Sequence, residues 1–161
     1  MIRIANPRDY LAEWVARFVK NKDLIVKNIL EISQKEEIVI AKLKDGKEHI
    51  YLIEPFLDNS NLISSLDRLK GHDNCSLAVY NTKEAFDAVI KSWEKLAKFK
   101  RHFSIYFINP FSKTEKRWTL YPMTHDLVTE GAGLKAGLLS LFSTVDSTTK
   151  EEIERVLKDD K

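Results

Sequence analysis

The chain begins with apolar residues at the spacing of an α-helix. Asn6 and Pro7 suit the start of that helix, because asparagine caps free backbone amides and proline has no N–H to leave unpaired. The helix is expected to end near residues 20–22. The following segment, 23–33, also places isoleucines on one helical face and is predicted to be helical. The apolar stripe of the first helix consists of Tyr10, Leu11, Trp14, Val15, Phe18 and Val19.

Two strand-like segments with apolar residues on both faces follow, at 37–43 and 48–54. An Asp-Gly dipeptide lies between them, which is typical of a tight β-hairpin turn. A two-residue turn at this dipeptide predicts that Ile40 lies opposite Tyr51. Strands that are apolar on both faces are usually covered on both sides, so we expect helices on both faces of the sheet.

The rest of the chain alternates between helical and strand-like patterns. Helices are indicated by an apolar stripe behind a capping residue, and strands by short apolar runs. The predicted elements are a helix at 58–70, a strand at 75–80, a helix capped by Asn81 that ends near residue 100, strands at 103–108 and 117–121, and a final helix that starts with a capping box from Thr148 to Glu151.

This order of elements predicts a single α/β domain over residues 1–161. Strand–helix–strand connections give parallel neighbours with right-handed crossovers, and hairpins add antiparallel strands. The predicted fold class is therefore a three-layer α/β/α sandwich with a mixed sheet of about five strands, built from a hairpin, two parallel crossovers and a second hairpin.

This topology loosely resembles the restriction-endonuclease-like fold. The resemblance implies an acid near the hairpin and a (D/E)xK motif on the next strand, where carboxylates hold Mg²⁺ and lysine steadies the attacking water. Asp45 and Glu54 are the acids near the hairpin, but Pro55 and Phe56 follow Glu54, so the motif lacks its lysine. An inactive relative is therefore favoured over an active nuclease.

Composition narrows the functional classes. The 26 basic and 24 acidic side chains give a formal charge of +2, which is a weaker excess than nucleic-acid binders usually show. Cys75 is the single cysteine, so the chain forms no internal disulfide and no cysteine-rich metal site, and Cys75 is predicted to be a buried hydrophobe. The apolar runs are too short to span a bilayer. We expect a cytoplasmic protein with no membrane partner, metal or cofactor.

One candidate binding feature is a group of glycines at an expected helix start. Gly131 and Gly133 precede Lys135, and backbone amides at a helix start bind phosphate or carboxylate. The spacing departs from the dinucleotide-binding and Walker fingerprints. The alternative interpretation is that Gly133 shapes the start of the helix, while Ala136 and Gly137 let the helix lie close to the sheet. The predicted ligand-binding set consists of Gly131, Gly133 and Lys135 together with Thr124, His125 and Asp126.

A catalytic trio is a second candidate. Tyr121, His125 and Lys135 supply a phenol, an imidazole and an ammonium group, which can cleave RNA without a metal ion. The trio is similar in kind to that of the tRNA-splicing endonucleases, whose surrounding sequence pattern is absent. The alternative interpretation is that His125 and Asp126 form a surface hydrogen-bonding pair or cap. We expect Tyr121 to Asp126 to form a loop.

Two broader surfaces complete the candidates. Three predicted strands end in Glu54, Asn81 and Asn109, and the carboxyl ends of parallel strands commonly bind ligands. A series of basic residues can contact phosphates, with Trp118 and Tyr121 available to stack on bases, or can be a solvated helix end. The basic residues are Lys95, Lys98, Lys100, Arg101, His102, Lys113, Lys116 and Arg117.

These observations favour a binding or regulatory module for an anionic ligand, a nucleic acid or a protein partner. One alternative is a divergent or inactive nuclease-fold enzyme with phosphodiester chemistry near Tyr121 and Lys135. A further alternative is a homo-oligomeric structural module whose exposed aromatic surface forms the interface.

Overall fold

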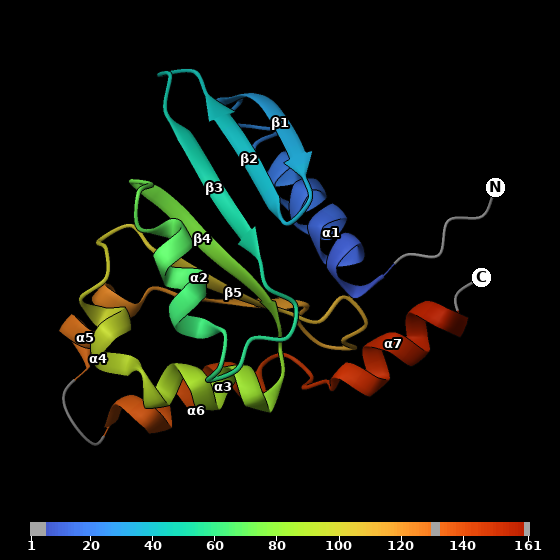
Figure 1. Ribbon diagram of the computed structural model, residues 1–161, viewed down its shortest axis with the longest axis vertical. Coiled ribbons are helices and arrows are strands. Elements are labelled where there is room, and N and C mark those ends of the chain that lie inside the picture. The colour runs from blue at the N-terminus through green and yellow to red at the C-terminus, as the bar shows by residue number, and fades with distance from the viewer. Residues whose placement is uncertain (1–5, 130–132, 160–161) are drawn as a thin grey trace.

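The computed structural model describes residues 6–129 and 133–159, which form a mixed α/β structure around one open sheet (Figure 1). The sheet has six strands in chain order. The pairs β1–β2, β2–β3 and β5–β6 are antiparallel, and β3–β4 and β4–β5 are parallel. The strands are β1 (Ile29–Lys35), β2 (Ile38–Leu43), β3 (Glu48–Ile53), β4 (Asn74–Tyr80), β5 (Ser104–Ile108) and β6 (Arg117–Leu120).

Helices cover both faces of the sheet, as the two-sided apolar strands predict. Buried residues of α1 and α7 share a core with one face, and buried residues of α2, α3, α4 and α6 share a second core with the other. The helices are α1 (Pro7–Lys22), α2 (Leu62–Leu69), α3 (Lys83–Lys91), α4 (Trp93–Ala97), α5 (Pro122–Val128), α6 (Gly133–Ser143) and α7 (Lys150–Asp159). No helix in the described ranges is long and apolar enough to cross a bilayer.

The sixth strand comes from the segment 23–33, whose predicted helix is wrong. Asp23 ends α1 and turns the chain, because its carboxylate accepts the backbone N–H groups of Asn28 and Ile29, each at 2.8 Å. β1 then pairs along β2, so its backbone groups bond to a neighbouring strand. Isoleucines on one face suit an amphipathic helix and a strand alike, and pairing with β2 decides between them.

The predicted register of the β2–β3 hairpin is also wrong, by one residue. Ile40 pairs with Ile50, and Tyr51 pairs with Val39. The loop contains residues 44–46, closed by a 2.8 Å hydrogen bond from the backbone N–H of Leu43 to the carbonyl of Lys47, and Gly46 adopts φ 88°. This left-handed glycine belongs to a longer turn than the two-residue one expected. The shift brings the side chains of odd-numbered β3 residues to the face that α1 covers.

The helix predicted from Asn81 to residue 100 is two helices, α3 and α4, that meet at Ser92. Asn81 does not cap α3. The N-cap is Thr82, whose Oγ1 accepts the backbone N–H of Ala85 at 3.1 Å, while Asn81 is buried beneath it. At the final helix the predicted capping residue is displaced similarly, because Thr149 accepts the backbone N–H of Glu152 at 3.1 Å.

Candidate functional site

The residues from Tyr121 to Asp126 lie mainly in helix α5 and not in the loop that was expected. The Nδ1 atom of His125 lies 3.0 Å from the backbone oxygen of Tyr121, so the ring is held against the first turn. Asp126 accepts a 2.9 Å hydrogen bond from Nε1 of Trp93, which joins α5 to α4. Thr124 is exposed. His125 therefore bonds within the first turn of its own helix, and Asp126 bonds to the neighbouring helix α4.

The glycine group lies at the start of α6. Gly131 lies outside the described residues. Gly133 is the first residue of α6, and Lys135 is exposed on its first turn. A Cβ atom added to Gly137 would meet no atom within 4 Å, so close packing against the sheet does not explain that glycine. A ligand site at Gly133 and Lys135, and the trio with Tyr121 and His125, stay predictions.

The carboxyl ends of β3, β4 and β5 meet at one edge of the sheet, as their parallel order requires. Their polar side chains mostly bond within the chain. Glu54 accepts a 3.1 Å hydrogen bond from Ser65, and Asn109 donates at 2.9 Å to the carbonyl of Asp146. A hollow of about 240 Å³ beside this edge is lined by Phe56, Leu57, Asp58, Thr82, Glu84, Thr149, Lys150 and Glu151. Its acids outnumber its single lysine, which is unfavourable for an anion.

Asp45, an acid of the nuclease-like pattern, and Trp118, the expected stacking residue, both have structural roles. Asp45 accepts the backbone N–H of Lys47 at 2.9 Å within the hairpin turn. Trp118 is buried and stacks on Phe107 with ring centroids 4.2 Å apart, so it is not an exposed platform for bases. Within the described residues, no group of three or more His, Cys, Asp or Glu side chains is placed to hold a metal ion.

A polar row crosses the opposite, amino-terminal ends of the parallel strands, on the face that α1 covers. Nε2 of His49 on β3 lies 2.8 Å from Oγ of Ser76 on β4. The same Oγ lies 2.7 Å from Oγ of Ser104 on β5, because Ser76 and Ser104 are register partners. Both serines are buried. The two serines therefore hold the His49 ring in position through the bond to Ser76.

Two tyrosines extend this polar region along the same face. Tyr51 stacks on His49 with ring centroids 4.3 Å apart, and its ring centroid lies 5.9 Å from that of Tyr106. Phe18 of α1 meets Tyr106 edge-on at 5.9 Å. Burial raises the pKa of both tyrosines, which keeps their hydroxyls protonated at neutral pH. Several polar groups thus share a mostly apolar interface between helix and sheet.

His49 and Tyr51 line a cavity of about 230 Å³, which we name the His49 pocket. The end of α1 and the turn that follows it supply the opposite wall. That turn is held in place by the two hydrogen bonds that Asp23 accepts. The other lining residues are Val19, Lys22, Asp23, Val26, Asn28, Ile29, Ala41 and Leu43.

The charge state of His49 is set by its surroundings. Burial, with a smaller contribution from the nearby Lys22 ammonium, lowers the pKa of His49 from 6.5 to about 4. The ring is therefore neutral at pH 7, and the ring nitrogen that carries the proton decides whether Nε2 donates to the Ser76 hydroxyl or accepts from it. Neighbouring Cys75 is different: burial raises the pKa of its thiol to about 11, as befits the buried hydrophobe that was predicted.

Comparison of the chain with protein-family models, curated proteins and solved structures found no significant match. The function must therefore be inferred from the residues and their geometry. The His49 pocket is the leading candidate, because an apolar hollow with a few convergent polar groups and a shifted pKa is typical of a ligand site.

Sequence reasoning missed this pocket for an identifiable reason. The one-residue error in the hairpin register placed Tyr51 opposite Ile40, on the wrong face of β2. The available signal was a polar residue near the start of each parallel strand, namely His49, Ser76 and Ser104. Only the pairing of the strands shows that these three residues form one row.

Proposed function

We propose that the protein is a binding or regulatory module that takes a small anionic ligand with an apolar body into the His49 pocket. The observation that carries this proposal is the position of Lys22 and a neutral, hydrogen-bonded His49 in the lining of one mostly apolar cavity. A short aliphatic or single-ring carboxylate fits this chemistry. The cavity is smaller than the roughly 300 Å³ at which pockets for drug-sized ligands begin.

Lys22 is the group in the pocket lining that can pair with an anion. Lys22 and Asp23 both line it, but each carboxylate oxygen of Asp23 already accepts a backbone N–H group. Lys22 forms no salt bridge with another described residue. Its ammonium group can therefore pair with a ligand carboxylate while Val19, Ile29 and Leu43 contact the apolar body.

Replacing Lys22 with methionine is expected to weaken benzoate binding by a factor of about two to five, because Lys22 is exposed and an exposed ion pair contributes about 0.2–1 kcal/mol. Isothermal titration and the NMR signals of the His49 ring would measure this. Benzyl alcohol, which lacks the charge, should bind weakly to both proteins. Binding should also tighten as the pH falls from 7 to 5, because an anion beside His49 raises its pKa and favours proton uptake.

Lys95→Met is the matched control, because Lys95 is exposed on α4, which packs on the face of the sheet opposite the pocket. It should bind benzoate as the unmodified protein does. Equal affinities for benzoate and benzyl alcohol, with no effect of Lys22→Met, would contradict the proposal.

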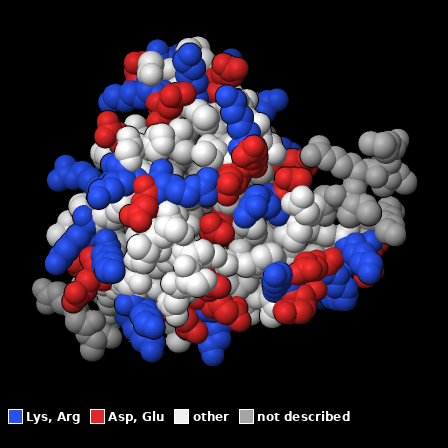
Figure 2. Space-filling view, in the orientation of Figure 1, with Lys and Arg blue, Asp and Glu red and all other residues white. Residues whose placement is uncertain are grey.

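A second candidate function, single-strand nucleic-acid binding, rests on the surface of α1. Figure 2 shows basic and acidic side chains interspersed over the face that carries α2 and α3, which offers no continuous basic track. Elsewhere, Trp14 and Phe18 stack at 5.4 Å and the Arg117 guanidinium lies 4.5 Å over Phe18. A shallow hollow of about 360 Å³ there is lined by Tyr10, Trp14, Arg17, Phe18, Asn21, Pro110 and Lys116. Aromatic rings beside cations suit bases and phosphates.

A single strand of about 10 thymidines is expected to quench the tryptophan fluorescence of the protein through stacking on Trp14. Trp14 is half-buried and the other tryptophans are buried, so the signal reports on this surface. Trp14→Phe should remove the quenching, and Arg17→Ala should lower the salt dependence of log K by about 0.7. Lys44→Ala serves as the control. An affinity that does not change with salt would rule this function out.

A further inference from the structure

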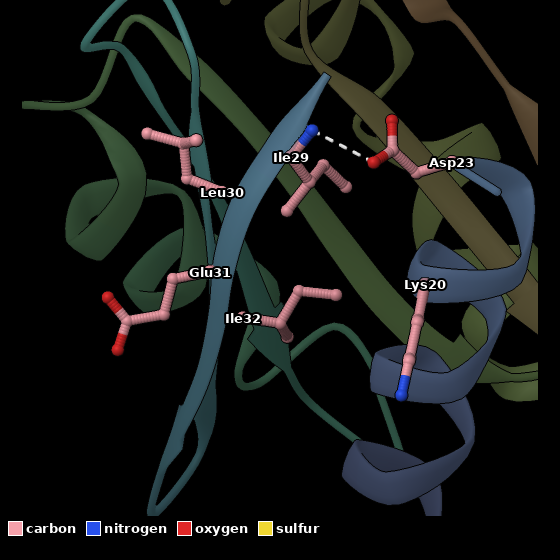
Figure 3. A pocket seen from close by; sticks show the side chains of 6 residues that line it. All are labelled: Lys20, Asp23, Ile29, Leu30, Glu31 and Ile32. Atoms are coloured by element: carbon pink, nitrogen blue, oxygen red, sulfur yellow. Dashed lines mark hydrogen bonds between the residues drawn. The ribbon is translucent and has the colours of Figure 1, made fainter. Parts of the chain in front are cut away.

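β1 lies at one end of the strand order, and among the described residues no further strand pairs with its outer edge. A hollow of about 290 Å³ runs beside it, lined by Lys20, Asp23, Ile29, Leu30, Glu31 and Ile32 (Figure 3). In this view Ile29 and Ile32 point toward α1, whereas Leu30 and Glu31 point away from it. The lining thus includes side chains from both faces of β1, so the hollow extends around the outer edge of the strand. Another strand can approach β1 along this edge.

The side chains on β1 follow from its pairing with β2. The register shifts between Ile29 and Glu31, so Leu30 is an extra residue in a β-bulge and is 62% exposed. Beyond the bulge the side chains alternate, which places Glu31, Ser33 and Lys35 on one face of the strand. All of these positions are at least partly exposed.

The charges on that face have a two-fold pattern. Glu31 and Lys35 lie at equal distances on either side of Ser33. If two copies of β1 pair antiparallel about Ser33, each Glu31 lies directly opposite Lys35 of the second copy, and opposite charges at such positions attract. Edge strands often carry charges that discourage pairing, but these charges are complementary to a second copy.

We infer that two copies of this chain associate through their β1 edges, antiparallel and centred on Ser33, to form one continuous sheet across a two-fold axis. Backbone hydrogen bonds along the edge and the paired charges select the second copy, and the contact covers part of the exposed Leu30. A single strand pair buries little area, so the dimer should form reversibly and depend on concentration. This association is independent of ligand binding in the His49 pocket.

Cross-linking tests the register directly. Facing residues of antiparallel strands bring their Cα atoms within the distance that a disulfide spans. Ser33→Cys is therefore expected to give a disulfide-linked dimer under mild oxidation. Gln34→Cys is the matched control, because position 34 then faces position 32 of the second copy and the two new thiols are too far apart. The natural Cys75 is buried and does not compete.

Exchanging the charges of Glu31 and Lys35 tests whether their pairing across the two-fold axis stabilises the dimer. Glu31→Lys or Lys35→Glu alone should weaken dimerisation about tenfold, because each puts two like-charged pairs across the axis. The double variant Glu31→Lys/Lys35→Glu should restore it, since the opposite charges face each other again. Analytical ultracentrifugation of each protein over a wide concentration range measures the dissociation constants.

Recovery in the double variant, together with cross-linking at position 33 alone, is the expected result. A protein that stays monomeric at every concentration, or a Gln34→Cys variant that cross-links as well as Ser33→Cys, would overturn the inference. The inference would also be overturned if the double variant Glu31→Lys/Lys35→Glu dimerised no better than either single variant.

Discussion

Replacing Asn81 with leucine is expected to lower the free energy of unfolding by about 4 kcal/mol, because it leaves buried hydrogen-bonding groups without partners. Asn81 is 0% exposed. Its Oδ1 accepts a 2.8 Å hydrogen bond from Nε1 of Trp118, and its Nδ2 donates at 3.1 Å to the carbonyl of Val145. Leucine has a similar size but offers neither bond.

This side chain connects three distant parts of the chain: the end of β4, strand β6, and the segment between α6 and α7. We therefore expect the Asn81→Leu variant to loosen that segment as well, which limited proteolysis would detect. Urea denaturation followed by circular dichroism measures the stability change. Asn59→Leu, at an exposed position, should change stability by less than about 0.5 kcal/mol.

A double-mutant cycle separates the hydrogen bond from a general packing effect. Trp118→Phe removes the indole N–H and keeps a ring stacked on Phe107. In the Asn81→Leu background this second change should cost less than it does alone, because the N–H it removes has already lost its acceptor. Strictly additive effects, or a loss below about 1 kcal/mol for Asn81→Leu, would contradict the proposed role of Asn81.

The second large effect is a loss of stability in mild acid that originates at His49. The folded pKa of about 4 lies below the usual 6.5, so the unfolded chain binds a proton more readily than the folded one between these values. Stability contributed by neutral His49 is fully present above pH 6.5 and declines as the pH falls toward 4. Each pKa unit corresponds to 1.36 kcal/mol, so the total loss is about 3 kcal/mol.

Denaturation curves recorded between pH 7 and pH 4.5 would show this loss. Glu37 and Asp58 have lowered pKa values, mainly through hydrogen bonds from Arg68 and Ser60, and their contributions are lost only at lower pH. His49→Gln should flatten the curve in the measured window, since glutamine does not titrate. His102→Gln, at an exposed position, should leave the slope unchanged. Parallel curves for the His49→Gln and unmodified proteins would show that His49 does not cause the pH dependence.

The two effects show where local sequence patterns stop being informative. Asn81 follows a buried strand and precedes a helix, which is the pattern of an N-cap. Thr82 forms the cap instead, because the Asn81 side chain is drawn into bonds with Trp118 and Val145. Those partners lie 37 and 64 residues away, beyond the reach of any capping rule.

Local sequence patterns suffice to predict the mixed α/β class, the start of α1 at Pro7 after its cap Asn6, and the apolar strands β2 to β5. These features depend on interactions within a few residues, such as a capping side chain or an apolar stripe. The tertiary structure alone decided that residues after Asp23 form β1, because the pairing with β2 outweighs helical periodicity. It also decided the hairpin register, through the left-handed Gly46.

The His49 pocket is another feature that only the tertiary structure decides. Its polar row joins residues that are 27 and 28 positions apart, on three strands whose pairing no local pattern specifies. The lowered pKa of His49 likewise arises only when α1 and the turn after it exclude water from the ring. Local chemistry therefore determined most of the helices and strands, and long-range packing decided that β1 forms and which side chains meet.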